Sequence, residues 1–321
     1  MSKYKNEVEA AEALKSAYNQ LKSEISKVIV GQDDVVRLVL TSIFCQGHSL
    51  LVGVPGLAKT LLIKTISDAL NLSFNRIQFT PDLMPSDIIG AETLDNERNF
   101  KFIKGPVFAN IILADEINRT PPKTQSALLE AMQEYSVTIA GENHALDRPF
   151  FVLATQNPIE QEGTYPLPEA QLDRFMFNIW LDYPTFEQEV DIVKSTTGAG
   201  LNKVKKVISK EEIIAFQELI RKVPVADNVV EYAVKLVQKT RPGTKDASEI
   251  TNNYLEWGSG PRGSQYLITA AKFNSLISDK YSPDIEDVQA VAKPILRHRT
   301  LRNFKAEAEG VTVDYIIEQL L

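Results

Sequence analysis

One string of eight residues, Gly53-Val54-Pro55-Gly56-Leu57-Ala58-Lys59-Thr60, limits what this chain can fold into more than any other feature. An apolar run at residues 49–52 precedes the string, and a helix-compatible run at residues 61–66 follows it. This is the strand–loop–helix context of a phosphate-binding loop, in which backbone N–H groups and a helix N-terminus attract a polyphosphate. We expect Lys59 to reach the β- and γ-phosphates and Thr60 to hold Mg²⁺ through its hydroxyl.

One position of this string departs from the general phosphate-loop pattern, G-x-x-x-x-G-K-[ST]. Ala58 stands where that pattern has its second glycine. Glycine enters the left-handed backbone region freely, whereas a residue with a Cβ is disfavoured there, so we expect Ala58 to have a negative φ. The residues expected to bind the nucleotide in and beside this loop are Gly53, Pro55, Gly56, Leu57, Ala58, Lys59, Thr60 and Leu61.

The length and composition predict a folded protein of two domains. A chain of 321 residues is longer than one compact core usually holds. Apolar residues make up 44% and charged residues 24%, which is typical of a globular protein and not of a disordered one. The formal net charge of −7 disfavours general nucleic-acid binding, which requires a basic surface, although a local basic patch stays compatible with it.

The sequence contains no signal for export or membrane insertion. Its first residues carry charges and no apolar segment of the secretory type. Its apolar runs are all much shorter than the ~20 residues that a helix needs to cross a bilayer. Cys45 is the single cysteine, so an internal disulfide cannot form. These features predict a cytoplasmic protein without a membrane span.

The two halves of the chain differ in pattern. In the first half, apolar runs alternate with helix-like segments at residues 60–70 and 122–134, which favours a parallel sheet covered on both faces. The predicted strands cover residues 48–52, 72–79, 109–114, 149–155 and 175–181. The second half is helical in periodicity, over residues 185–195, 210–222, 226–240, 262–278, 285–296 and 312–321. We predict an α/β core in residues 1–183, opening with a helix at residues 7–27, and a smaller all-α domain in residues 184–321.

Two hairpins are predicted within the α/β core. The first joins strand-like pieces at residues 90–94 and 99–103 through a turn that contains Asp95-Asn96. The second is expected where residues 136–139 meet residues 141–143. Such insertions are either ordinary surface structure or the parts that contact a partner, because loops on a rigid sheet often carry function.

A second motif supplies the chemistry that a phosphate loop lacks. The apolar residues 111–114 end in two adjacent carboxylates, Asp115 and Glu116, and look like a Walker B element. Hydrolysis of a γ-phosphate requires a metal ion to offset charge and a base that prepares water, and paired carboxylates at a strand end provide for both. We expect Asp115 to bind Mg²⁺ and Glu116 to activate the attacking water. An acidic pair at a strand end is common alone, but about fifty residues after a phosphate loop it is a specific signal.

Together these motifs resemble those of the AAA+ ATPases and, within them, the MoxR family. The phosphate loop has that family's G-x-P-G-x-A-K-T form, in which an alanine at the position of Ala58 is usual. Residues 115–125 look like its extended Walker B motif, and the resemblance runs from about residue 27 to residue 302. Four further segments are similar to its sensor-1 strand, its arginine-finger segment, its sensor-2 segment and a late motif: Ala154-Thr155-Gln156-Asn157-Pro158, Leu172-Asp173-Arg174-Phe175, Gly258-Ser259-Gly260-Pro261-Arg262-Gly263 and Leu296-Arg297-His298-Arg299.

The resemblance implies roles for three polar residues outside the first two motifs. Asn157, at a strand end, is expected to hydrogen-bond the attacking water or the γ-phosphate; the plain alternative is a turn residue before a proline. Arg174 is expected to reach the γ-phosphate of a neighbouring subunit and offset transition-state charge, the alternative being an ion pair with Asp173 or Glu169. Arg262 is expected to couple nucleotide state to the lid, or else to be a solvated charge at a helix start.

Two further assignments follow from the resemblance less firmly. The segment Val28-Ile29-Val30-Gly31-Gln32 matches the one that commonly packs against adenine in this superfamily, so Val30 and Gly31 are expected at the nucleotide. Any loop that enters a core has a similar composition, which leaves a purely structural role open. Arg119 is expected either at the subunit interface or in an ion pair with Glu116 or another nearby acid.

The resemblance also implies a fold and an activity. The fold is an AAA+ P-loop core, with a five-stranded parallel sheet in an αβα sandwich, followed by the smaller helical lid. The activity is Mg²⁺-dependent hydrolysis of ATP by a ring, expected to be a hexamer, with a chaperone-like role in the assembly or maturation of protein complexes. The implied partners are other copies of this chain and client proteins, among them proteins with von Willebrand factor A domains.

Two other functions stay open on the sequence alone. In a nucleotide-gated binding protein, the same residues would only reset an interaction. A DNA-remodelling ATPase would require basic residues on the hairpins or in the late cluster Arg297, His298, Arg299, Arg302 and Lys305. The first hairpin carries both signs of charge, and cations at a helix end are also favoured by the helix dipole, so nucleic acid is disfavoured as a partner.

Overall fold

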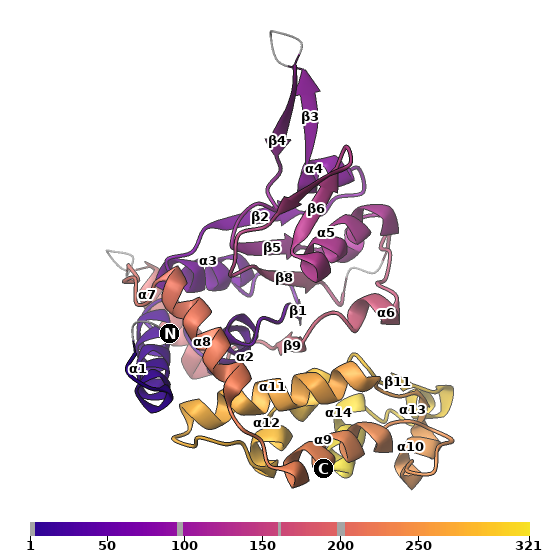
Figure 1. Ribbon diagram of the computed structural model, residues 1–321. Helices are drawn as coiled ribbons and strands as arrows, with labels where there is room; N and C mark the ends of the chain where they lie inside the picture. The colour runs from indigo at the N-terminus through magenta and orange to yellow at the C-terminus, as the bar shows by residue number, and fades with distance from the viewer. Residues whose placement is uncertain (1–3, 95–98, 160–161, 198–202) are drawn as a thin grey trace. The chain divides into compact units, whose positions relative to one another are not determined.

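The structure of the protein is a computed structural model that describes residues 4–94, 99–159, 162–197 and 203–321 (Figure 1). The chain divides into two compact units, each built from separate stretches. Ala17–Leu167 and Ile179–Ile214 form the first, here called the sheet unit. Met1–Ser16, Pro168–Asn178 and Ala215–Leu321 form the second, here called the helical unit. The single domain boundary expected between residues 183 and 184 stays a prediction.

A five-stranded sheet with the strand order β2-β5-β8-β1-β9 underlies the sheet unit (Figure 1). The strands are β1 (Ser49–Gly53), β2 (Phe74–Gln78), β5 (Ile111–Asp115), β8 (Phe151–Gln156) and β9 (Phe177–Leu181), whose first two residues belong to the helical unit. β5 pairs in parallel with β2 and β8, and β8 with β1. β5 and β8 are almost entirely buried, as expected for central strands covered on both faces. The predicted α/β core with five parallel strands is confirmed, and each predicted strand starts one or two residues before the observed one.

Helices connect and cover these strands. They are α1 (Glu7–Ile25), which begins in the helical unit, α2 (Asp33–Phe44), α3 (Lys59–Ala69), α4 (Pro85–Ile89), the 3-10 turn η1 (Ile117–Arg119), α5 (Pro122–Glu134) and α7 (Phe186–Thr197). α3 follows the phosphate loop and packs on β2 and β5. α2 is not among the predicted helices; nine of its twelve residues are buried, although Asp33, Arg37 and Thr41 recur at helical spacing.

Both predicted hairpins are present in the sheet unit. Their strands are β3 (Gly90–Leu94) with β4 (Phe100–Lys104), and β6 (Ser136–Ile139) with β7 (Glu142–Ala145). The turn expected at Asp95-Asn96 lies outside the described residues. Figure 1 shows β3 and β4 extending away from the sheet. Gly90 begins this hairpin at φ +99, where an added Cβ would collide with the carbonyl oxygen of Ile103. Phe102 and His144 stack with ring centroids 4.3 Å apart, so the two hairpins touch.

Helices dominate the helical unit. They are α6 (Glu169–Leu172), α8 (Lys210–Lys222), whose first turn belongs to the sheet unit, α9 (Asp227–Lys239), α10 (Glu249–Tyr254), α11 (Pro261–Ile277), α12 (Ile285–Leu296), α13 (Phe304–Ala308) and α14 (Val313–Leu320). α11 packs along α12 and against α9. The predicted helical lid is confirmed. The structure adds the short helices α10 and α13, and β10 (Leu255–Trp257) pairs antiparallel with β11 (Leu301–Arg302). Such short strands leave no periodic signal in a sequence. Across the described ranges, no helix has the length and apolar character that crossing a membrane requires.

Candidate nucleotide site

The phosphate loop spans the gap between β1, which ends at Gly53, and α3, which begins at Lys59. The Lys59 ammonium donates a hydrogen bond back to the Gly53 carbonyl, so the loop closes on itself. Gly56 has φ +85, and the space around its missing Cβ is open. The left-handed turn at Gly56 therefore leaves the loop backbone accessible to a ligand, as wrapping a polyphosphate requires.

Ala58 contradicts the expectation of a negative φ, which was wrong. It has φ 54 and ψ 29, in the left-handed region, and caps the N-terminus of α3. A residue with a Cβ costs roughly 1–2 kcal/mol in this region. Its carbonyl oxygen accepts the Leu62 N–H at 2.9 Å, the first hydrogen bond of the helix. The chain has to turn left-handed here to enter α3, and alanine, with the smallest Cβ-bearing side chain, tolerates that turn.

The two carboxylates at the end of β5 are held by polar side chains of the neighbouring strands. Asp115 Oδ1 accepts a hydrogen bond from Thr155 Oγ1 at 2.6 Å, and its Oδ2 lies 2.6 Å from Arg76 Nη2. Glu116 has φ 58 and ψ 50, a left-handed conformation that non-glycine residues rarely adopt. Its N–H donates to Thr155 Oγ1 at 2.9 Å, and its Oε2 accepts from Gln78 Nε2 at 3.1 Å. β2, β5 and β8 thus fix both acids at one end of the sheet.

Arg119 lies one turn beyond these acids. Its Nε is 4.0 Å from Glu116 Oε2, across η1. This contact agrees with the ion pair, which is one of the two roles expected for Arg119. A role of Arg119 between subunits stays a prediction.

Asn157 follows β8 and is fixed by one hydrogen bond. Its Oδ1 accepts the backbone N–H of Ile159 at 3.1 Å. Its Nδ2 is buried and has no hydrogen-bond partner among the described residues. A buried amide donor without a protein partner is costly unless a ligand or water takes the bond. Asn157 can therefore be both a turn residue and a ligand-binding residue, since each role uses a different atom of its side chain.

These residues surround one cavity of 380 Å³. Its lining consists of Pro55, Gly56, Leu57, Ala58, Lys59, Thr60, Arg76, Asp115, Glu116 and Asn157. Burial lowers the pKa of Lys59, and the nearby charges of Asp115 and Glu116 oppose that shift. Arg76 is the one lining residue that sequence reasoning missed, because a single arginine in a strand belongs to no motif. The register that pairs Gln78 with Asp115 puts Arg76 two residues earlier on the same face of β2, which only the structure reveals.

A second cavity of 710 Å³ adjoins the loop and shares four of its residues. Val30 and Gly31 line it together with Trp180 and Tyr183. Gly31 has φ +73, and the side chain of Gln188 fills the place of its missing Cβ. An aromatic and aliphatic lining next to a phosphate loop is suited to a nucleobase. The remaining predicted contact, Leu61, lines neither cavity and faces a different one beside Lys64.

The residues present fit ATP with Mg²⁺. The Thr60 hydroxyl and the Asp115 carboxylate are hard oxygen donors, which Mg²⁺ prefers. The Lys59 ammonium and the loop N–H groups suit phosphate oxygens. The unpartnered Nδ2 of Asn157 supplies a donor at the same cavity.

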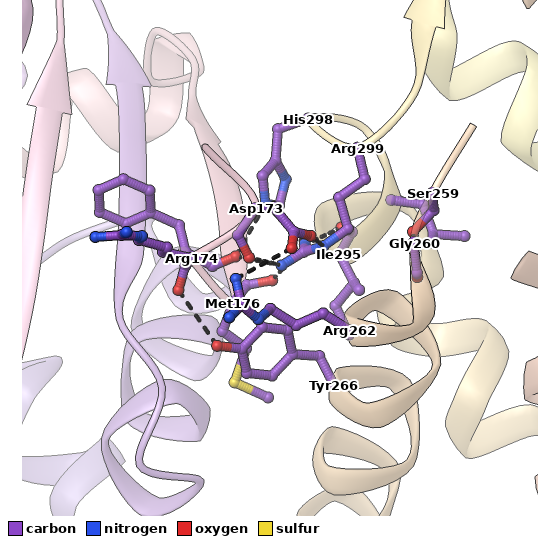
Figure 2. A network of polar contacts seen from close by, with 12 residues as sticks. Asp173, Arg174, Met176, Ser259, Gly260, Arg262, Tyr266, Ile295, His298 and Arg299 are labelled. Carbon is purple, nitrogen blue, oxygen red and sulfur yellow. Dashed lines mark hydrogen bonds and ion pairs between the residues drawn. The ribbon is translucent and has the colours of Figure 1, made fainter. Parts of the chain in front are cut away.

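Arg174 and Arg262 belong to the helical unit and are not among the residues that line either cavity. Arg262 Nη1 lies 3.1 Å from Asp173 Oδ2, so it forms an ion pair and is not a freely solvated charge (Figure 2). The late basic cluster does not form an exposed basic surface. His298 and Arg299 are buried, and Arg297 pairs with Asp314 at 2.7 Å.

Comparison with known proteins agrees with this geometry. The family model described as "ATPase family associated with various cellular activities (AAA)" matches residues 48–177, and the model of the AAA lid domain matches residues 247–320. Chaperone MoxR1 of Mycobacterium tuberculosis is 41% identical over 299 residues, which cover 93% of this chain and 79% of that protein. The chain belongs to the MoxR family of AAA+ ATPases. Protein MoxR of Methylorubrum extorquens is a more distant relative, 28% identical over 307 residues that cover 89% of this chain and 88% of that one.

The MoxR relationship extends to a protein without a described role and to a solved structure. The uncharacterised protein YeaC of Bacillus subtilis is 42% identical over 299 residues, covering 92% of this chain and 91% of YeaC. A crystal structure from Cytophaga hutchinsonii, described as an ATPase candidate, superposes with a TM-score of 0.91 and 43% identity over 97% of this chain and 95% of that one. This agreement covers nearly the whole chain and supports a MoxR-type α/β core followed by a lid.

Proposed function

We propose that this MoxR protein is a Mg²⁺-dependent ATPase that works as a ring, expected to be a hexamer, in the cytoplasm. One observation carries the proposal. Lys59, Thr60, Asp115, Glu116 and Asn157 come from separate parts of the sequence and line a single cavity. The chemistry at a γ-phosphate uses each of these groups: two acids, an ammonium and an amide donor that has no partner among the described residues.

Each residue has a distinct part in the proposed hydrolysis. Lys59 and the loop N–H groups bind the phosphate oxygens, while Thr60 and Asp115 would hold the Mg²⁺ ion. Bound Mg²⁺ supplies positive charge that offsets the charge on the phosphates. Glu116 accepts the proton of the attacking water, and its left-handed backbone keeps the carboxylate at the strand end. Asn157 donates from Nδ2 to that water or to the γ-phosphate.

Arg174 completes the site of a neighbouring subunit in this proposal. An arginine that enters a phosphoryl-transfer site from outside offsets transition-state charge and contributes on the order of 10³-fold or more in rate. A lone chain should therefore hydrolyse ATP slowly. Arg262 is proposed to link nucleotide binding to the position of α11.

The proposed biological role is the assembly or maturation of other protein complexes. Two of the relatives carry the names Chaperone MoxR1 and Protein MoxR, which supports a chaperone-like role. The β3–β4 hairpin presents apolar side chains to solvent, and Phe100 is 75% exposed. An exposed aromatic on a projecting hairpin is suited to contact a protein. We propose protein clients for this surface, with von Willebrand factor A domain proteins among the candidates.

The test is the Glu116→Gln variant. It should bind ATP as the wild type does and lose turnover by at least about 100-fold, because only the base is removed. The measurements are steady-state phosphate release and equilibrium binding of a fluorescent ATP analogue, with and without EDTA. Glu130→Gln, an exposed acid on α5, is the matched control and should keep wild-type turnover.

The same variant separates the proposed ATPase motor from its rivals. Wild-type turnover in Glu116→Gln, or turnover that EDTA does not abolish, would overturn the proposal. If the variant captures a partner in ATP and wild-type turnover is not stimulated by that partner, a nucleotide-gated switch is the better description. Salt-sensitive DNA binding would instead favour a DNA-remodelling ATPase.

A further inference from the structure

The backbone on both sides of Arg174 is held by side chains of the helical unit (Figure 2). Residues 173–176 connect the end of α6 to the start of β9 and are neither helix nor strand. Carbonyl groups in such a connection cannot join a regular ladder, and burying them without a partner is costly. Here four consecutive carbonyl oxygens, those of Asp173, Arg174, Phe175 and Met176, each accept a hydrogen bond from a side chain.

Phe175 O lies 2.9 Å from His298 Nε2, and Arg299 supplies a hydrogen bond to three of the four carbonyl oxygens. Its Nη2 lies 2.9 Å from Asp173 O and 2.6 Å from Phe175 O, and its Nη1 lies 3.2 Å from Met176 O. The fourth oxygen accepts from Tyr266 on α11, whose hydroxyl donates to Arg174 O at 3.2 Å. The Arg299 guanidinium also lies over the Tyr266 ring, 5.1 Å from its centroid. Tyr266 and Arg299 therefore contact each other as well as residues 173–176.

The Asp173 carboxylate joins two arginines to this connection. Its Oδ1 accepts from Arg299 Nε at 2.8 Å, and its Oδ2 accepts from Arg262 Nη1 at 3.1 Å. The two arginines differ in exposure: the Arg299 side chain is 1% exposed and the Arg262 side chain 40%. Arg299 is thus buried, whereas Arg262 is partly exposed and pairs with the same carboxylate.

Only arginine can make this set of contacts. Burial lowers the pKa of Arg299 to about 10, and the Asp173 charge opposes that shift, so the side chain stays charged at neutral pH. A buried charge is tolerated when its donors are all satisfied. The guanidinium offers five N–H donors in a fixed plane, whereas a lysine ammonium offers three from one point. The contacts with Asp173, Phe175 and Met176 span both edges of that plane.

We propose that Arg299 is a positioning residue for Arg174. It fixes residues 173–176 to the end of α12 and to α11, so that Arg174 extends from a rigid backbone. The inference rests on the proposed function, in which Arg174 completes a neighbouring site. An arginine finger has to be placed closely, because an error of 1 Å in a catalytic geometry can cost on the order of 10²-fold in rate. Through Asp173, the same anchor ties Arg262 to the finger segment.

The first test compares Arg299→Lys with Arg302→Lys. Arg302 is another arginine of the helical unit; its Nη1 donates to Val311 O at 2.9 Å, and its Nη2 lies 4.0 Å from Glu307 Oε1. Arg299→Lys should lower kcat by about tenfold or more and change KM for ATP by less than about threefold, since nucleotide binding does not use this segment. Arg302→Lys should leave both values near the wild type. A raised KM with an unchanged kcat would overturn the inference.

The second test asks whether the effect of Arg299 passes through Arg174. In an Arg174→Ala background, Arg299→Lys should cause no further loss of kcat, because the residue that it positions is already missing. An equal loss in both backgrounds would show a general structural role and overturn the inference. Tyr266→Phe is the safer second variant if Arg299→Lys folds poorly by circular dichroism. It removes the hydroxyl that donates to Arg174 O and should reduce kcat about two- to fivefold, again without effect in the Arg174→Ala background.

The third test mixes subunits. Glu116→Gln subunits have intact fingers and inactive sites, while Arg299→Lys subunits have intact sites and misplaced fingers. Mixing the two should give a higher turnover than either variant alone, because Arg174 of the Glu116→Gln subunits can then complete the intact sites of the Arg299→Lys subunits. The Arg174→Ala and Glu116→Gln mixture is the reference. If the reference mixture is inactive, the proposed trans role of Arg174 fails; if only the Arg299→Lys mixture is inactive, this inference fails alone.

Discussion

Thr155 Oγ1 donates a hydrogen bond to Asp115 Oδ1 over 2.6 Å, from one strand of the sheet to the next. The same oxygen accepts the Glu116 N–H at 2.9 Å. One hydroxyl therefore sets the direction of the carboxylate proposed for the metal and the backbone of the residue proposed as the base. Thr155 is buried and does not line the cavity itself, so it acts on the site through its two neighbours.

Replacing Thr155 with valine, which has nearly the same shape, should lower kcat by about tenfold and raise the Mg²⁺ concentration needed for half-maximal turnover. The Asp115 carboxylate oxygen and the Glu116 N–H would each lose a partner. Binding of a fluorescent ATP analogue should change by less than about threefold, because the phosphate loop is untouched. Thr155→Ser keeps the hydroxyl and serves as the control; if it is as impaired as valine, the hydrogen bonds are not the cause.

The backbone of Ala58 leads to a second prediction. Ala58→Val places a β-branched side chain at φ 54, where such residues are genuine outliers, and should lower the free energy of unfolding by about 1–2 kcal/mol. It should also weaken ATP binding. Ala58→Gly relieves the left-handed strain but adds freedom to the unfolded chain, so stability should rise by at most about 1 kcal/mol. Urea denaturation measures both, and Ala308→Val, at an exposed helical position, should cost no more than about 0.7 kcal/mol.

Replacing Gln125 should cause a large loss of stability. This buried side chain on α5 donates from Nε2 to carbonyl oxygens of Ile117, Thr120 and Tyr165, at 3.2, 3.0 and 2.9 Å. Gln125→Met should destabilise the protein by about 2–4 kcal/mol, because several buried carbonyls lose their donor. Turnover should fall as well, since Ile117 and Thr120 lie one and four residues after Glu116. The matched control is Gln133→Met, exposed on the same helix, which should stay within about 0.5 kcal/mol of the wild type in urea.

The buried His48 should make the protein less stable at acidic pH. Burial lowers the pKa of His48 from 6.5 to about 4, against a smaller opposing effect of its hydrogen bond with the Met132 carbonyl. Its Nδ1 accepts the Val152 N–H at 3.0 Å, which requires an unprotonated nitrogen. The unfolded chain therefore binds a proton more readily than the folded one. Stability is unaffected by this group above pH 6.5 and falls by about 3 kcal/mol as the pH drops towards 4.

Urea denaturation between pH 4 and pH 7 tests this sign. His48→Gln should be less stable at neutral pH but should lose most of the decline between pH 6.5 and 4. His144→Gln, on the β6–β7 hairpin, should keep the decline of the wild type. An unchanged slope in His48→Gln would show that other groups cause the acid sensitivity.

Features with a local cause were predictable from the sequence. The strands appear because apolar runs are bounded by turn residues, and α5 (Pro122–Glu134) was located at its observed bounds because its start carries a proline and its apolar residues recur with helical period. The phosphate loop and the Asp115-Glu116 pair were predictable because they are contiguous motifs. α2 was not predicted, because a short, mostly apolar run can be either strand or helix.

Features that depend on residues far apart in the sequence could not be predicted from it. The φ of Ala58 was predicted wrongly because the expectation weighed only the residue's own preference, while the loop and α3 together impose the turn. Arg76 carries no motif, and its place beside Asp115 follows from strand register. Asp173 is the clearest case. The sequence offered Arg174 as its neighbour in an ion pair, yet its carboxylate goes to arginines 89 and 126 positions away.

The anchoring of residues 173–176 by Arg299 has a consequence for dividing and recombining this protein. A fragment that starts at residue 184 would retain Arg299 and lose the carbonyls and the carboxylate that surround it, leaving a buried cation with nothing to neutralise it. Such a fragment should be insoluble or only partly folded unless Pro168–Asn178 is supplied with it. Chimeras between relatives face the same requirement. Two stretches of chain more than a hundred positions apart would have to be exchanged together, and their sequences should vary in concert.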